Sequence, residues 1–154
     1  ASKVVHSSLT PGTGATAARP LAVKAGTRLF GEGSSCQAYL FLLAGTVRRF
    51  PPEAMRDETG ARLKVPHIGW NRVFQASAHP LWRGIEDGAR FYFVHSYYVE
   101  PARPELVAGF THYPFAFASA VAENNLFAVQ FHPEKSQAAG LSLLANFISW
   151  DGAG

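Results

Sequence analysis

A run of aromatic and β-branched residues at positions 91–99, FYFVHSYYV, constrains the fold of this chain more than any other segment. Residues of these types favour strands, and the turn-forming pair Asp87–Gly88 and Pro101 bound the run. The run does not alternate between apolar and polar residues. We therefore expect one strand with both faces buried, as in the middle of an α/β sheet.

Shorter strand signals lie on both sides of this run. Residues 46–50 alternate weakly and stop at two prolines, as a strand entering a loop would. Residues 63–68 predict a short strand, interrupted by a proline, that ends at residues 69–71. Residues 117–122 and 126–131 are separated by Glu-Asn-Asn, which predicts a hairpin with a tight turn.

The pattern changes to that of a helix after Pro133. Apolar residues at i, i+3, i+4 and i+7 predict one buried helix face, made of Leu141, Leu144, Ala145 and Ile148. Ser136 stands where it could cap this helix. The last hundred residues thus predict a mixed sheet closed by a helix, and the length of 154 residues fits a single domain spanning 1–154.

Composition and charge exclude several classes of function. The chain is 47% hydrophobic and 16% charged, so it can bury a core. Its net charge of +3 comes from scattered residues, which argues against a nucleic-acid partner. The longest apolar run, residues 38–44, is too short to span a bilayer, and no signal-peptide pattern is present. Cys36 is the only cysteine, which indicates a reducing compartment, and we expect a cytoplasmic protein.

The most informative string for chemistry is FAVQFHPEKS at residues 127–136. A buried strand delivers His132 at its carboxyl end, and Glu134 follows two residues later. If the chain stays extended there, both side chains project to the same side, and the carboxylate can orient the imidazole as a general base. The alternative is a buried structural histidine beside a solvated acid.

This string resembles the histidine–glutamate signature of the class I glutamine amidotransferases. Three further strings resemble the glutaminase subunits of imidazole glycerol phosphate synthase in order and spacing: LAGTVRRF at 43–50, VPHIGWN at 65–71 and FVHSY at 93–97. The resemblance covers about residues 44–150. It implies a three-layer α/β fold with a mixed sheet flanked by helices, well matched over 42–150 and degenerate over 1–41.

The resemblance also implies a function. Members hydrolyse glutamine with a Cys-His-Glu triad and pass ammonia through a tunnel to a (β/α)₈-barrel cyclase subunit in histidine biosynthesis. The implied assembly is a heterodimer, with L-glutamine as substrate and neither a cofactor nor a metal. Matching positions are the catalytic pair His132 and Glu134, the glutamine-pocket residues Ser96 and Tyr97, and the cyclase-interface residues Trp70, Tyr92 and Lys135.

The family's nucleophile has no clear counterpart. The Gly-x-Cys-x-Gly elbow is absent, and the best alignment of residues 20–30 puts Lys24 at the cysteine position. A lysine cannot form the thioester that a cysteine would form. Cys36 lies about ten residues beyond the aligned position and is the alternative nucleophile.

The N-terminal part of the predicted sheet is incomplete. Gly12, Thr13 and Gly14 resemble the loop whose backbone N–H groups stabilise the oxyanion. Too few residues separate this loop from Leu21 for a parallel crossover, which needs roughly a dozen.

Three hypotheses follow for the whole chain. It is a glutaminase subunit that feeds a cyclase; or it is a non-catalytic subunit that docks on the cyclase, without glutaminase activity; or its N-terminal third results from a frameshift or an internal deletion. A metal site is not indicated, because His67, His95 and His112 are isolated in the sequence and form no recognisable ligand set.

Overall fold

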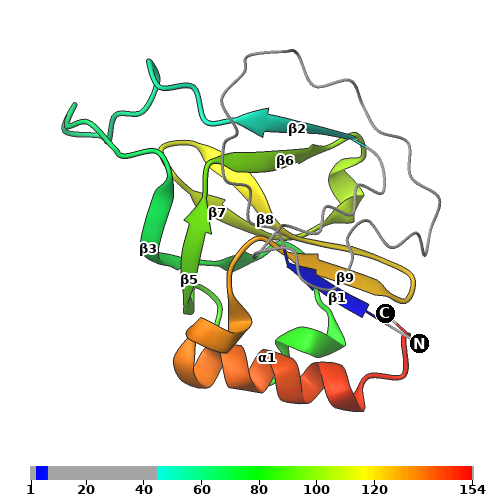
Figure 1. Cartoon of the computed structure of the whole chain (residues 1–154). Coiled ribbons are helices and arrows are strands. Elements are labelled where there is room, and N and C mark those ends of the chain that lie inside the picture. Colours follow the sequence, from blue (N-terminus) through cyan, green and yellow to red (C-terminus); the bar gives the residue numbers. More distant parts are fainter. Residues whose placement is uncertain (1–2, 7–44, 154) are drawn as a thin grey trace, which may run out of the picture.

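The computed structural model describes residues 3–6 and 45–153, and a sheet of seven strands dominates this part of the chain (Figure 1). Five strands follow one another across the sheet in the order β1 (Lys3–His6), β9 (Leu126–Val129), β8 (Ala116–Glu123), β6 (Tyr97–Pro101) and β2 (Gly45–Arg49). The other two branch from β8, which pairs with β7 (Val107–His112), and β7 in turn with β4 (Phe74–Gln75).

The sheet is mixed. Strands β1 and β9 run parallel, whereas the other pairs in the sheet are antiparallel. The helix α1 (Gln137–Ser149) follows the last strand and lies below the sheet in Figure 1. The predicted α/β class and the mixed sheet closed by a helix are therefore confirmed.

The predicted strand at 91–99 is wrong as a single element, because the chain changes sheets at Ser96. Strand β5 (Arg90–His95) pairs with β3 (His67–Arg72) in a separate two-stranded ribbon, whereas β6 joins the main sheet. Burial alternates along β5, so only one of its faces is buried. The sequence concealed this alternation because the other face carries Tyr92 and Val94, which are also strand-forming residues.

The strand predicted at 63–68 is displaced toward the C-terminus. The β3 ladder begins at His67, directly after Pro66, which has no N–H to donate. Gly69, Trp70 and Asn71 were expected to end the strand, but they pair with residues 93, 92 and 91 of β5.

The hairpin prediction is confirmed. Strands β8 and β9 pair from Ala120 and Val129 to Glu123 and Leu126, which leaves a two-residue turn. Asn124 in this turn has φ of 52°, a left-handed conformation that asparagine tolerates better than most residues.

The described residues include three short 3₁₀ helices: η1 (Pro80–Trp82) and η2 (Pro104–Leu106) lie between strands, and η3 (Pro133–Lys135) lies between β9 and α1. Asn146 fastens α1 to η1, because its amide donates to the carbonyl oxygens of Leu81 and Arg83 at 2.9 and 2.7 Å. Within the residues described, no helix is both long enough and apolar enough to cross a membrane.

The helix after Pro133 is confirmed, but its predicted buried face is wrong. Leu141 and Ile148 are 64% and 85% exposed, whereas Leu143 is fully buried. Gly140 explains this orientation: an added Cβ there would lie 1.9 Å from the carbonyl oxygen of Pro133. The close approach is possible only with glycine facing η3, which turns the neighbouring Leu141 outward.

Phenylalanine dominates the core between sheet, ribbon and helix. Two fully buried rings, Phe91 of β5 and Phe131 after β9, pack with centroids 4.2 Å apart and so join the ribbon to the main sheet. The other buried phenylalanines of the cluster are Phe50, Phe93, Phe117 and Phe127.

A matched pair of truncations tests the orientation of α1. Leu143→Ala is expected to lower the free energy of unfolding by about 2–5 kcal/mol, because it leaves a cavity in the core. Leu141→Ala, on the exposed face, is expected to change it by less than about 0.5 kcal/mol. Urea unfolding of both variants measures the difference, and equal losses would contradict the observed helix face.

Candidate active site

His132 lies where the main sheet, the ribbon and α1 meet. Strand β9 leads to it through Gln130 and Phe131, and it stands at the N-cap of η3. Its backbone N–H donates to the carbonyl oxygen of Tyr92 on β5 at 2.9 Å, an isolated antiparallel bridge. The residue is 7% exposed, so the imidazole is held in a largely buried position.

The structure brings His132 and Glu134 together, as the sequence predicts. Nδ1 of His132 lies 2.9 Å from Oε1 of Glu134. The backbone is not extended here, in contrast to the sequence-based expectation; it turns into η3, and the i, i+2 contact forms within that turn. A carboxylate accepts the Nδ1 proton, so the lone pair of the neutral ring lies on Nε2, the nitrogen of a general base.

Ser136 does not cap α1 with its side chain, contrary to the sequence prediction. It occupies the N-cap position but makes no side-chain bond to the helix. Its hydroxyl instead donates to the carbonyl oxygen of His132 at 2.5 Å and accepts the backbone N–H of Tyr92 at 3.0 Å. The residue is 1% exposed.

Ser96 and Tyr97, the predicted glutamine-pocket residues, mark the passage from the ribbon to the main sheet. Ser96 is buried, and its carbonyl oxygen accepts the N–H of Phe50 at 3.0 Å. The carbonyl oxygen of Tyr97 lies 2.8 Å from Nδ1 of His95 and accepts its proton. This segment is therefore fixed through its backbone from two sides.

His67 and His95 form a pair that the sequence did not predict. They face one another across β3 and β5, with Nδ1 of His67 2.8 Å from Nε2 of His95. His95 donates its Nδ1–H to the carbonyl oxygen of Tyr97, so in the neutral ring the lone pair lies on Nε2. This Nε2 accepts a hydrogen bond from the Nδ1–H of His67. Each histidine lies in a motif string noted above, but pairing them requires the register of the ribbon.

Burial keeps both histidines neutral. It lowers the pKa of His67 from 6.5 to about 3, and the neighbouring His95 adds to the effect. Burial likewise lowers the pKa of His95 to about 4; its bond to the carbonyl of Tyr97 opposes the shift, and His132 reinforces it. Two neutral rings with fixed tautomers thus link β3 to the segment at Ser96–Tyr97.

The predicted interface residues lie on the outer side of the ribbon and on η3. Trp70 and Tyr92 are cross-strand neighbours with ring centroids 5.8 Å apart. Trp70 is 38% exposed, and Ile68 on the same face of β3 is 57% exposed. Lys135 is exposed beside Glu134 in η3. Aromatic and aliphatic side chains exposed together are typical of a docking surface.

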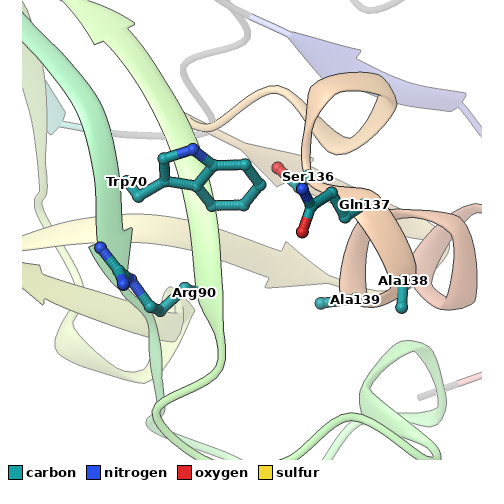
Figure 2. Close-up of a pocket in the computed structure, with 6 residues that line it drawn as sticks. All are labelled: Trp70, Arg90, Ser136, Gln137, Ala138 and Ala139. Atoms are coloured by element: carbon teal, nitrogen blue, oxygen red, sulfur yellow. The ribbon is translucent and has the colours of Figure 1, made fainter.

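A pocket of about 390 Å³ separates this surface from the start of α1 (Figure 2). In Figure 2 the indole of Trp70 extends toward Ser136 and Gln137. The lining residues are Trp70, Arg90, Ser136, Gln137, Ala138 and Ala139. The pocket therefore borders the turn that carries His132.

Other predicted residues lie outside the described part of the chain. These are Gly12, Thr13 and Gly14 of the oxyanion loop, and the two positions considered for the nucleophile, Lys24 and Cys36. Residues 3–6 and 45–153 contain no cysteine. Within these same ranges, no three His, Cys, Asp or Glu side chains group as metal ligands.

Comparison with known proteins matches this chain to a family model and to curated relatives. The family model described as glutamine amidotransferase class-I matches residues 13–150. Imidazole glycerol phosphate synthase subunit HisH of Thiobacillus denitrificans is 66% identical over 114 residues, which cover 74% of this chain and 50% of that protein. HisH 1 of Pseudomonas aeruginosa is 58% identical over 121 residues, covering 79% of this chain and 54% of that protein.

The chain spans about half the length of the curated relatives it matches. Among solved structures, a GMP synthase-like protein of Thermoplasma acidophilum matches with a TM-score of 0.50 and 16% identity. The match covers 68% of this chain and 47% of that one. It supports the fold alone.

The neutral histidine pair predicts a loss of stability in acid. In the unfolded chain each histidine binds a proton as the pH falls below about 6.5, whereas the folded chain binds it only near pH 3–4. Each contributes a slope of up to about 1.4 kcal/mol per pH unit in this window, with stability lost as the pH falls.

His95→Gln removes one of the two titrating groups and keeps a donor and an acceptor. Between pH 7 and 5, we expect this substitution to reduce the contribution that His67 and His95 together make to the slope of unfolding free energy against pH to about half its parent value. Urea unfolding across that range measures the slope. His112→Gln, at an exposed position, is the control and is expected to keep the parent slope. An unchanged slope in His95→Gln would contradict the assignment.

Proposed function

The chain belongs to the class-I glutamine amidotransferase family, and on that premise we propose that it serves as the glutaminase subunit of an imidazole glycerol phosphate synthase. In this role it hydrolyses glutamine to glutamate and ammonia and supplies the ammonia to a cyclase subunit in histidine biosynthesis. The relatives named HisH support this assignment. The assembly proposed is a cytoplasmic heterodimer.

The observation that carries the proposal is the contact between His132 and Glu134. With the Nδ1 proton held by Glu134 at 2.9 Å, Nε2 of His132 can take a proton from a thiol. The thiolate then attacks the amide carbon of glutamine, and His132 returns the proton to the departing ammonia. In the second half, His132 takes a proton from water, whose oxygen attacks the thioester carbon; the C–S bond breaks, glutamate is released, and the departing thiolate takes the proton back from His132. Glu134 stabilises the imidazolium at both stages.

The thiol itself must come from outside residues 3–6 and 45–153, which hold no cysteine. Cys36 is the candidate within this chain. The other candidate is a cysteine in a polypeptide segment that corresponds to the half of the relatives not spanned by this sequence. Either way, the described residues supply the base and its orienting carboxylate.

Ser96 and Tyr97 are proposed to contact glutamine, and Trp70, Tyr92 and Lys135 to contact the cyclase. The hydrogen bonds that run from β3 through His67 and His95 to Tyr97 support a connection between the two groups. Loop residues 12–14 are proposed to contribute oxyanion contacts.

Ammonia release from glutamine tests the proposal. The full chain is assayed alone and with the cyclase subunit and its nucleotide ligand, next to Cys36→Ala and His132→Ala. If Cys36 is the nucleophile, both substitutions are expected to abolish turnover. If the parent is inactive, a chimera is assayed that joins residues 45–154 to the N-terminal half of the Thiobacillus denitrificans relative.

We expect the chimera to release ammonia in the presence of the cyclase. His132→Ala is expected to reduce kcat by about 10²–10⁴-fold or more, the usual contribution of a general base. His112→Ala, an exposed histidine, is the matched control and should retain the parent rate. An inactive chimera that still binds the cyclase would instead favour the non-catalytic docking subunit.

Docking is tested through Trp70. Trp70→Ala is expected to weaken binding to the cyclase by at least about 2 kcal/mol, roughly 30-fold in Kd, as for a central aromatic anchor. Ile148→Ala removes a large exposed apolar side chain from α1 and serves as the control. Titration calorimetry with the cyclase measures both, and equal affinities for the two variants would contradict the proposed surface.

A further inference from the structure

The bridge between His132 and Tyr92 contains an inserted hydroxyl group. Two residues in a hydrogen-bonded antiparallel pair normally exchange both N–H···O bonds directly. Here His132 N–H reaches the carbonyl of Tyr92 directly at 2.9 Å. The return bond passes through Ser136: Tyr92 N–H donates to its Oγ at 3.0 Å, and the hydroxyl donates to the carbonyl of His132 at 2.5 Å.

The position of Ser136 favours this use of its hydroxyl. A serine at an N-cap ordinarily accepts from the first turn of the helix, but Ser136 makes no such bond. The residue is 1% exposed. Its hydroxyl donates to the carbonyl oxygen of His132 and accepts the N–H of Tyr92, the two residues of the bridge. The hydroxyl therefore ties the turn to β5.

Helix α1 closes the turn from the opposite side. The N–H of Gly140 donates to the carbonyl of Ser136 at 3.0 Å. An added Cβ at Gly140 would lie 1.9 Å from the carbonyl oxygen of Pro133 and 2.8 Å from Cβ of Ser136. The turn from His132 to Ser136 is thus held between β5 and the backbone of α1.

We propose that Ser136 is a positioning residue for His132: its hydroxyl completes the bridge to Tyr92 and thereby keeps the imidazole aligned with Glu134. This inference deepens the proposed function, because it rests on His132 being the base of that site. A general base acts within hydrogen-bond reach of its proton, and small displacements of such groups are costly to the rate. The hydroxyl acts through His132 and does not itself contact substrate.

Ser136→Ala tests the proposal, with Ser119→Ala as its matched control. Ser119 is also buried, at 1% exposure, and its hydroxyl accepts from Thr111 at 2.9 Å on the far strands β7 and β8. Both variants therefore lose a buried hydroxyl: Ser136→Ala removes its two hydrogen bonds to Tyr92 and His132, and Ser119→Ala removes the bond from Thr111. They are prepared in the full chain labelled with ¹⁵N.

Two signals are followed by NMR: hydrogen exchange of the Tyr92 amide and the ring Nδ1–H resonance of His132. In Ser136→Ala, exchange at Tyr92 is expected to be about tenfold faster, the change that corresponds to one lost hydrogen bond. The His132 ring proton is expected to broaden or disappear as its alignment with Glu134 is lost. Ser119→Ala is expected to leave both signals as in the parent.

The proposal is overturned if Ser136→Ala gives the same two signals as Ser119→Ala. It is also overturned if exchange at Tyr92 rises while the His132 ring proton is unchanged, since Ser136 would then only strengthen the fold. Should Ser136→Ala fail to fold, Ser136→Cys keeps a weak donor and acceptor and is expected to change both signals in the same direction, by less. Neither signal requires glutamine or a cyclase, so a failure of the proposed function remains distinguishable.

Discussion

The backbone bridge from His132 to Tyr92 is the contact on which the arrangement of the site depends. It connects three parts of the molecule that are distant in sequence: the end of β9, the middle of β5 and, through Ser136, the start of α1. The packed rings of Phe91 and Phe131 lie directly beside it and exclude water from the junction. A buried backbone bond with such apolar neighbours is stronger than the same bond in water, which favours one fixed orientation of the turn.

The histidine pair extends this fixed geometry across the ribbon. His67 and His95 are neutral, and each hydrogen bond in the series from β3 to the carbonyl of Tyr97 defines the tautomer of the next ring. The outer face of β3 carries the proposed docking residue Trp70. The hydrogen bonds through the two rings therefore connect β3 to the carbonyl oxygen of Tyr97.

Local features of this fold could be predicted from the sequence, and those that depend on contacts between distant segments could not. The contact of His132 with Glu134 spans two residues, and the turn at Asn124 closes a local hairpin, so both follow from short strings. The buried face of α1 was predicted wrongly because the hydrophobic pattern counts Leu141 as a core residue and takes no account of Gly140. The missing side chain of Gly140 is what allows that side of the helix to pack against η3. The division of the strand at Ser96 was hidden because both faces of β5 carry apolar residues.

The change of sheets at Ser96 makes the two halves of the site independent in register. A slip of one residue reverses the faces of a whole strand, but the slip is confined to the sheet in which it occurs. An altered register of β6 against β2 or β8 would therefore leave His67 opposite His95, since β5 belongs to the ribbon. Ser96 is therefore the residue at which the pairing of the ribbon ends and that of the main sheet begins, so the two registers are specified by different strands.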